Sequence, residues 1–99
     1  MSFDEKVWKA LKKIPKGKVA TYKQIAGLAG SPNAFRAVGN ACNKNPHAPM
    51  TPCHRVVSSS GSLGGYAGGL KKKIKLLESE GIRIKNNRIV NFTEVLSKF

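Results

Sequence analysis

The stretch TYKQIAGLAGSPNAFRAVGNACNK, residues 21–44, decides the fold of this chain. Thr21, followed three residues later by Gln24, forms a capping box, which predicts that a short helix begins there. Ser31 as the N-cap and Pro32 at the first helical position predict a second helix that runs to about residue 44. Two helices joined by a tight glycine-containing turn are typical of a helix-turn-helix.

The segments on either side of this motif complete a mostly helical α+β pattern. Ser2 and Glu5 form a second capping box, with apolar residues at helical spacing behind it, so we expect a helix ahead of the motif. Behind the motif we expect a glycine-rich loop, a further helix, and a small β-hairpin that turns at Asn86-Asn87. The whole pattern predicts one winged helix-turn-helix-like domain over residues 1–99.

The charge balance predicts a polyanionic partner. The chain has 18 Lys and Arg residues against 5 Asp and Glu residues, a net charge of +13. Such an excess points to nucleic acid or to an acidic membrane surface. The chain starts without a basic region ahead of an apolar stretch, and no apolar run approaches the roughly 20 residues that span a bilayer. We therefore expect an intracellular protein (cytoplasmic, or nuclear in a eukaryote) that is monomeric, does not enter membranes and keeps its cysteines reduced.

The second helix of the motif has an unusual surface for reading DNA. Arg36 and Asn40 are its only pair of base-reading side chains at suitable spacing, and much of the rest is Ala and Gly. Small residues let a helix approach closely, which suits the minor groove and the DNA backbone. The alternative is an ordinary surface helix on which Arg36 is merely solvated.

Cys53, in the stretch TPCHRVV, is the candidate nucleophile. His54 and Arg55 place two potential cations beside its sulfur, and positive charge raises the thiolate fraction. A buried inert thiol and an acyl-transfer nucleophile are the alternatives. A metal site would use Cys42, His47, Cys53 and His54. Its spacing is unsuitable, because the side chains of adjacent residues rarely point at one ion, so we expect no metal.

Glu80 lies at the end of the helix after the glycine-rich loop, where the helix dipole disfavours an acid. A carboxylate there could hold His54 in the tautomer that accepts a proton from Cys53. The alternative is an exposed glutamate that pairs with one of the many lysines.

Six stretches carry a family resemblance: PCHRV (52–56), TYKQIA (21–26), RAVGNA (36–41), NP (45–46), GYAGGL (65–70) and EG (80–81). In order and spacing they resemble the O6-alkylguanine-DNA alkyltransferases, the methylated-DNA–protein-cysteine methyltransferases. The resemblance extends from Phe3 to Val90. It identifies residues 1–99 with the C-terminal catalytic domain of that family, without the N-terminal domain that many relatives carry.

The resemblance implies direct repair of double-stranded DNA that contains O6-alkylguanine. The domain would bind the minor groove, rotate the damaged base into a pocket and transfer the alkyl group irreversibly to its own cysteine, with no cofactor and no metal. The implied catalytic residues are Cys53, His54, Glu80, Tyr66 and Asn45. The implied DNA contacts are Tyr22, Arg36, Ala37, Gly39, Asn40 and Ser59, with Arg36 filling the gap in the base stack. The implied base pocket comprises Tyr66, Val56 and Ala67.

Two other functions remain open. Alkyltransferase-like proteins bind the same lesions without the reactive cysteine, and the presence of Cys53 favours the enzyme over such a sensor. A small DNA-binding regulator with an incidental cysteine would bind by sequence and transfer nothing. Two positions depart from the family pattern. Phe35 precedes Arg36 where a small residue is frequent, and Cys42 is either a core thiol or a secondary reactive site.

Overall fold

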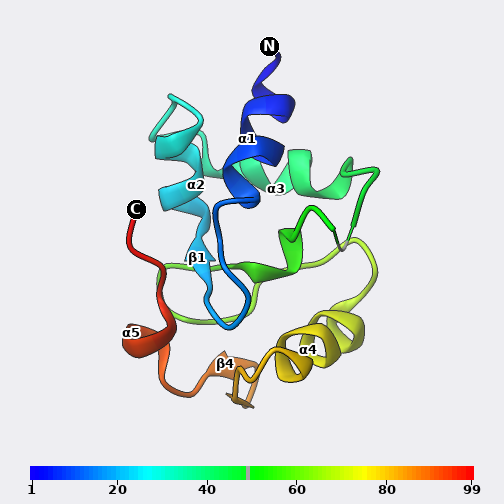
Figure 1. Ribbon diagram of the computed structural model, residues 1–99, viewed down its shortest axis with the longest axis vertical. Helices are drawn as coiled ribbons and strands as arrows, with labels where there is room; N and C mark the ends of the chain where they lie inside the picture. The colour runs from blue at the N-terminus through cyan, green and yellow to red at the C-terminus, as the bar shows by residue number, and fades with distance from the viewer. Residues whose placement is uncertain (49) are drawn as a thin grey trace.

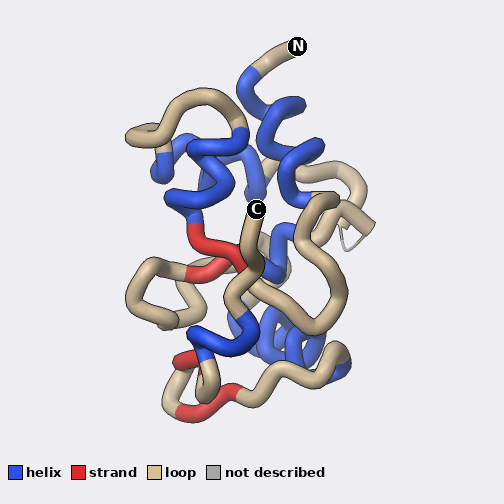
Figure 2. The backbone as a smooth tube through the Cα atoms, turned by 60° about the vertical axis from the view of Figure 1, so that its left-hand side comes forward, coloured by secondary structure: helices blue, strands red, loops and turns tan. Residues whose placement is uncertain are grey.

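The computed structural model describes residues 1–48 and 50–99. Within them the elements are, in chain order, α1 (Phe3–Leu11), β1 (Ala20–Thr21), α2 (Tyr22–Leu28), α3 (Phe35–Asn43), the 3-10 helix η1 (Cys53–Arg55), β2 (Val56–Val57), α4 (Leu70–Ser79), β3 (Ile84–Lys85), β4 (Arg88–Ile89) and α5 (Phe92–Val95). The strands are short, and helix and loop make up most of the backbone (Figure 2). The prediction of a mostly helical α+β fold is confirmed.

Both predicted capping boxes are formed. The Ser2 hydroxyl accepts from the Glu5 amide at 3.1 Å, and the Glu5 carboxylate accepts from the Ser2 amide at 3.2 Å. Thr21 and Gln24 make the same reciprocal pair at 3.0 and 2.9 Å. Each box satisfies backbone N–H groups that the first turn of a helix leaves without partners. Local sequence therefore fixes where α1 and α2 begin.

The predicted start of α3 is wrong. The helix begins at Phe35, and its N-cap is Ala34, which makes no side-chain capping bond. Ser31 instead serves the end of α2, where its amide donates to the Ala26 carbonyl at 3.0 Å across Gly30, whose φ is +86°. Ser31 is therefore part of the glycine-based C-cap of α2. The Ala34 amide donates to the Ser31 carbonyl at 2.9 Å, which forms a turn ahead of α3. Pro32 therefore lies in a turn and not in the first helical position.

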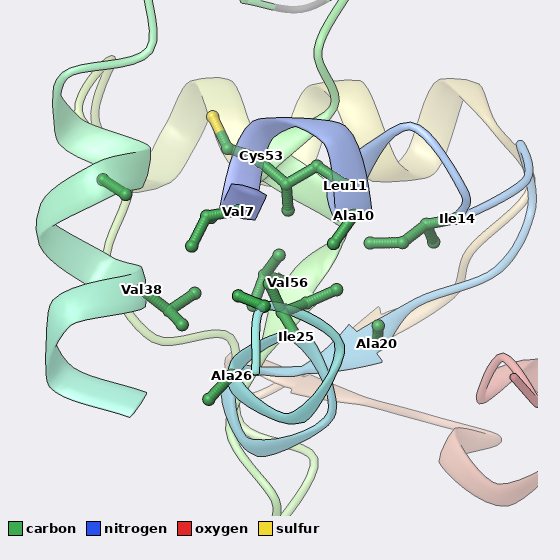
Figure 3. Close-up of a cluster of buried hydrophobic side chains, with 12 residues drawn as sticks. Val7, Ala10, Leu11, Ile14, Ala20, Ile25, Ala26, Val38, Cys53 and Val56 are labelled. Carbon is green, nitrogen blue, oxygen red and sulfur yellow. The ribbon is translucent and has the colours of Figure 1, made fainter. Parts of the chain in front are cut away.

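Helices α1, α2 and α3 pack together at one end of the molecule (Figure 1). Between them and η1 lies a cluster of buried apolar side chains that includes Cys53 (Figure 3). Strand β1 pairs in parallel with β2, with Ala20 opposite Val56 and Thr21 opposite Val57. Since β1 leads directly into α2 and β2 follows directly on η1, this pairing holds Cys53 at a fixed place beneath the helix-turn-helix.

The hairpin of β3 and β4 lies at the other end of the molecule, close to α4 (Figure 1). Asn86 and Asn87 turn it with φ values of +52° and +60°, the left-handed pair that two-residue hairpin loops need, so the predicted hairpin is confirmed. A second apolar cluster lies beneath it, built mainly around Leu63, Leu77 and Ile89. None of the helices within residues 1–48 and 50–99 has the length and apolar character needed to cross a bilayer.

Candidate active site

Cys53 is the first residue of η1, and its side chain is 4% exposed. Its sulfur lies at the edge of the apolar cluster and points away from the cluster's centre (Figure 3). There it lines a cavity of about 200 Å³ whose other walls come from α2, from α3 and from the loop between Gly65 and Ala67. The nucleophile predicted from sequence is thus placed at the base of a hollow large enough for a small ligand.

The prediction that Glu80 holds His54 is supported by the geometry. His54 is 1% exposed, and its Nε2 lies 3.1 Å from Oε2 of Glu80. Burial lowers the pKa of His54, and the bond to Glu80 only partly offsets this, so the imidazole is held neutral. Because Nε2–H donates to the carboxylate, the lone pair of this tautomer lies on Nδ1. That atom is buried and has no hydrogen-bond partner among the described residues.

Arg55 is a part of this site whose role the sequence did not reveal. Its Nε donates to Glu80 Oε1 at 2.9 Å and one terminal nitrogen donates to Oε2 at 2.6 Å, a bidentate pair. The other terminal nitrogen donates to the Ile14 carbonyl at 2.7 Å. Burial alone would raise the pKa of Glu80, but the bonds from Arg55 and His54 outweigh it and lower the pKa. The carboxylate therefore stays ionised where the dipole of α4 opposes it.

The Cys53 thiol is polarised by three neighbours. The neighbouring Cys42 thiol is the largest cause that lowers the pKa of Cys53; burial opposes it, and the Asn45 bond and the charge of Lys73 add to the lowering. Asn45 Nδ2 lies 3.5 Å from the Cys53 sulfur and donates to the Thr51 carbonyl at 2.8 Å. Each contact favours the thiolate, the reactive form of cysteine.

Lys73 is a buried cation that the sequence analysis missed. Its ammonium group donates to three backbone carbonyls, those of Val56 at 2.7 Å, Gly65 at 3.0 Å and Leu63. Burial lowers its pKa to about 8. The helical spacing could have indicated that Lys73 is buried, because position 73 lies on the same face of α4 as Leu77, four residues on. Lys73 ties β2 to the loop that forms the cavity wall.

Two tyrosines flank the thiol. Tyr66 and Ala67 line the cavity, and burial raises the pKa of Tyr66, so its hydroxyl remains a proton donor. Tyr22, at the start of α2, lines the same cavity, and burial raises its pKa to about 12. The side chain of Val56 is fully buried in the apolar cluster and does not line the cavity, which leaves its backbone for any contact with a base.

Four of the remaining predicted residues lie on α3. Arg36 and Asn40 are exposed, and Ala37 and Gly39 are half-buried. Gly39 and Asn40 line the cavity that contains Cys53. Ser59 lies apart from them in a neighbouring cleft of about 290 Å³, whose walls are Tyr22, Lys23, Phe35, Ser58 and Ser59. Tyr22 is common to both hollows, so one aromatic ring separates them.

No three of the His, Cys, Asp and Glu side chains in the described part of the chain are grouped so that they could hold a metal ion. His54, one of the four ligands considered from sequence, directs Nε2 at Glu80 instead.

The fold and the site together define a helix-turn-helix domain with a buried cysteine–histidine–glutamate group. Residues 2–82 match the family model described as 6-O-methylguanine DNA methyltransferase, DNA binding domain. The chain belongs to this family.

Relatives and solved structures agree with this assignment. A methylated-DNA–protein-cysteine methyltransferase of Methanosarcina barkeri is 55% identical over 78 residues, 79% of this chain and 49% of the relative. The Homo sapiens protein of that name is 52% identical, over 84% of this chain and 41% of the relative. The chain thus spans about half the length of the curated relatives it matches.

Two solved structures are similar in fold. Mycobacterium tuberculosis OGT in complex with DNA has a TM-score of 0.79 and 49% identity, over 82% of this chain and 49% of that one. Schizosaccharomyces pombe Atl1, in complex with damaged DNA containing O6-carboxymethylguanine, has a TM-score of 0.85 and 35% identity. The match to Atl1 covers 98% of this chain and 95% of that one.

Proposed function

We propose that this chain repairs O6-alkylguanine in double-stranded DNA by moving the alkyl group irreversibly to Cys53. The observation that carries the proposal is the placement of the Cys53 thiol, which lines a cavity and is followed directly by a buried His54 bonded to Glu80. The family match and the relatives' names support the same chemistry. Residues 1–99 act in this proposal as one domain of the C-terminal catalytic type.

The reaction is a single displacement at the alkyl carbon. Cys53 gives up its proton towards Nδ1 of His54, directly or through water, while Glu80 stabilises the imidazolium that forms. The sulfur then forms a bond to the alkyl carbon as the bond from that carbon to O6 of guanine breaks. Tyr66 donates towards N3 of the departing guanine, and Asn45 braces the loop that carries the thiol. The thioether has no easy leaving group, so each molecule reacts once and needs no cofactor.

DNA binding is assigned to the exposed face of α3. Arg36 enters the base stack where the damaged guanine is rotated out, and the small Ala37 and Gly39 let α3 approach the minor groove closely. Asn40 contacts the DNA beside Arg36. The net charge of +13 draws the protein to the phosphates.

Three further residues contact the nucleotide. Tyr22 presses on the phosphate beside the rotated base, and Ser59 contacts a phosphate from the neighbouring cleft. Ala67 contacts the base in the cavity. Val56 contributes through its backbone, since its side chain is buried in the core. The protein acts as a monomer, inside the cell, where its substrate is.

A stoichiometric transfer assay tests the proposal. The protein is mixed with a duplex that carries one O6-methylguanine, and peptide mass spectrometry locates any added methyl group. One methyl group on Cys53 with guanine restored and no turnover is the expected result, and Cys53→Ser should bind the duplex without transfer. Unmodified Cys53 after tight binding to the lesion would overturn the enzyme proposal.

A damage sensor is the second candidate. The fold match to Atl1, which was solved with damaged DNA, favours it, with a TM-score of 0.85. A sensor needs no nucleophile, so the thiol with a lowered pKa beside His54 argues for the enzyme. The transfer assay separates the two, because a sensor protects the lesion and leaves it unrepaired.

A further inference from the structure

The two cysteines of this chain line the same cavity although they come from different elements. Cys53 belongs to η1, and Cys42 lies in the last part of α3. Cys42 packs against the buried cluster that contains Cys53, and both side chains line the cavity. The neighbouring Cys53 thiol and burial raise the pKa of Cys42, while the neighbouring Cys42 thiol lowers that of Cys53. One sulfur of the pair is thus the nucleophile, and the other keeps its proton.

The surroundings favour attack by the Cys53 sulfur on a small oxidant. The buried ammonium of Lys73 and the amide of Asn45, 3.5 Å from the sulfur, both favour the thiolate. A cavity of about 200 Å³ is several times the roughly 30 Å³ that a water molecule takes up in the liquid, so a peroxide can reach the sulfur. Thiolate character and access are what make a cysteine sensitive to peroxide.

We propose that Cys42 is the resolving thiol of Cys53 and that hydrogen peroxide converts the pair to an intramolecular disulfide. The Cys53 thiolate attacks one peroxide oxygen and the O–O bond breaks, which leaves a sulfenic acid and hydroxide. The Cys42 sulfur then attacks the Cys53 sulfur, the S–S bond forms and the S–O bond breaks. The departing hydroxide takes the Cys42 proton. In total, two thiols and one peroxide give one disulfide and two waters.

The fold allows the second step, formation of the disulfide, by rotation of the two side chains. A disulfide needs sulfurs about 2.05 Å apart, closer than two unbonded sulfurs can lie, so the side chains must rotate towards each other. Both side chains border the open cavity, which gives them room to do so. The backbones that carry them are fixed, because α3 packs on α1 and α2 while η1 packs on α1 and α4. Rotation about side-chain bonds is therefore the available motion.

The disulfide would protect the nucleophile. A sulfenic acid that meets no second thiol can be oxidised further to sulfinic acid, which thiol reductants do not reverse, whereas a disulfide returns two thiols on reduction. While it lasts, the disulfide keeps Cys53 from accepting an alkyl group, a consequence that rests on the proposed function. The formation of the disulfide does not depend on that function.

The test uses the full chain without DNA. The protein is treated with hydrogen peroxide, free thiols are counted with a chromogenic disulfide reagent, and the intact mass is measured. We expect the two thiols to disappear together with a loss of about two daltons, and dithiothreitol to restore both. Peptide mapping should join the Cys42 peptide to the Cys53 peptide within one chain.

Replacement of Cys42 supplies the comparison. Cys42→Ser should accumulate sulfenic acid on Cys53, which a 1,3-diketone traps, and should lose the Cys53 thiol irreversibly at peroxide doses from which the wild type recovers. Cys42→Val repeats the test with an apolar side chain, and circular dichroism confirms the fold of each variant. A free Cys42 beside an oxygenated Cys53 in the wild type would overturn the proposal. So would cross-linked dimers as the sole product, or two thiols that resist peroxide.

The thiol count and the transfer assay test the two proposals independently. A chain that forms the disulfide but transfers no alkyl group contradicts the proposed function alone. A chain that accepts the alkyl group on Cys53 but never joins it to Cys42 contradicts this inference alone.

Discussion

Nε2 of His54 lies 3.1 Å from Oε2 of Glu80, and that carboxylate is held at the same time by the guanidinium of Arg55. Two neighbouring residues of η1 therefore share one acid at the end of α4. A carboxylate that carries two fixed partners cannot swing away from the imidazole. The orientation of His54 beside the thiol is thereby set before any substrate enters the cavity.

Replacing Glu80 by Gln should slow the reaction of Cys53 with a methylated duplex by at least about tenfold. The amide keeps the shape of the side chain but cannot stabilise an imidazolium. Single-turnover transfer measured by quenched flow checks this, with Glu78→Gln, an exposed change on the same helix, as the matched control. Equal rates in the Glu80 and Glu78 variants would show that the carboxylate has no part in the chemistry.

The same variant should change the stability of the protein in acid. The pKa of Glu80 in the folded state lies below its ordinary value of 4.5, so the folded state favours the ionised form. The stabilisation is present above about pH 4.5 and is lost as the pH falls through the lowered pKa. Urea unfolding between pH 3 and 6 (roughly the range of carboxylate titration) measures this effect. As the pH falls, the free energy of unfolding should decrease less in Glu80→Gln than in the wild type.

How far the sequence predicts this fold depends on how local each signal is. The capping boxes at Ser2 and Thr21 and the turn at Asn86-Asn87 are formed as predicted, because each is completed within a few residues. The predicted start of α3 was wrong, because Ser31 could either cap the start of α3 or complete the end of α2. In the structure it completes the end of α2.

The site shows the same division. The contact between His54 and Glu80 was one of two uses of Glu80 that the sequence left open, the other being a surface pair with a lysine. The bidentate bond from Arg55 was not predicted, because Arg55 and Glu80 are brought together only by the packing of η1 on α4. Lys73 was not singled out from the sequence, and only the tertiary structure shows that its ammonium group donates to buried backbone carbonyls.

Replacing Lys73 by Met should destabilise the fold by about 3 kcal/mol. Methionine fits the apolar path of the stem but leaves three backbone carbonyls without their donor. Lys72→Met, at an exposed neighbouring position, should change the free energy of unfolding by less than about 0.5 kcal/mol. Denaturant unfolding of both variants checks this, and similar values for the two would show that the buried ammonium has no structural role.

The pKa of Lys73 also predicts a dependence on alkaline pH. Burial lowers it to about 8 from an ordinary value of 10.5, so between these values the unfolded chain binds more protons than the folded chain. Stability should therefore gain a contribution that rises with pH in this window, and Lys73→Met should lack it. The difference in unfolding free energy between wild type and variant, followed from about pH 7.5 to 9.5, isolates this contribution. A difference independent of pH would contradict the lowered pKa.

Gly64 should not tolerate a side chain. Its φ is +70°, and a Cβ there would lie 2.9 Å from the hydroxyl of Tyr22. Gly64→Ala should cost about 1–2 kcal/mol and displace the Tyr22 ring between the two hollows. Gly27→Ala is the matched control, since it lies within α2 with no atom within 4 Å of the added Cβ, and it should be stabilising by about 0.5–1 kcal/mol. Thermal unfolding compares them, and equal shifts would exclude the clash.

The exposed aromatic beside Arg36 should take part in DNA binding. Phe35 is 49% exposed at the first position of α3, so its ring does not turn inward to the core. A flat ring in that place can stack on a base next to the gap that Arg36 fills in the proposed function, and such stacking contributes about 1–3 kcal/mol. Phe35→Ala should therefore weaken binding to a lesion-containing duplex by roughly tenfold.

The salt dependence of DNA binding distinguishes the apolar contribution of Phe35 from the contribution of the surrounding charges. Phe35→Ala removes no charge, so the slope of log affinity against log salt should stay unchanged, and the weakening should be the same at every salt concentration. Val90→Ala serves as the control, because Val90 is also 49% exposed but lies after β4, at the end of the molecule away from α3 (Figure 1). Fluorescence anisotropy titrations at several salt concentrations measure both. Tighter binding by Phe35→Ala would show instead that the ring keeps α3 away from the groove.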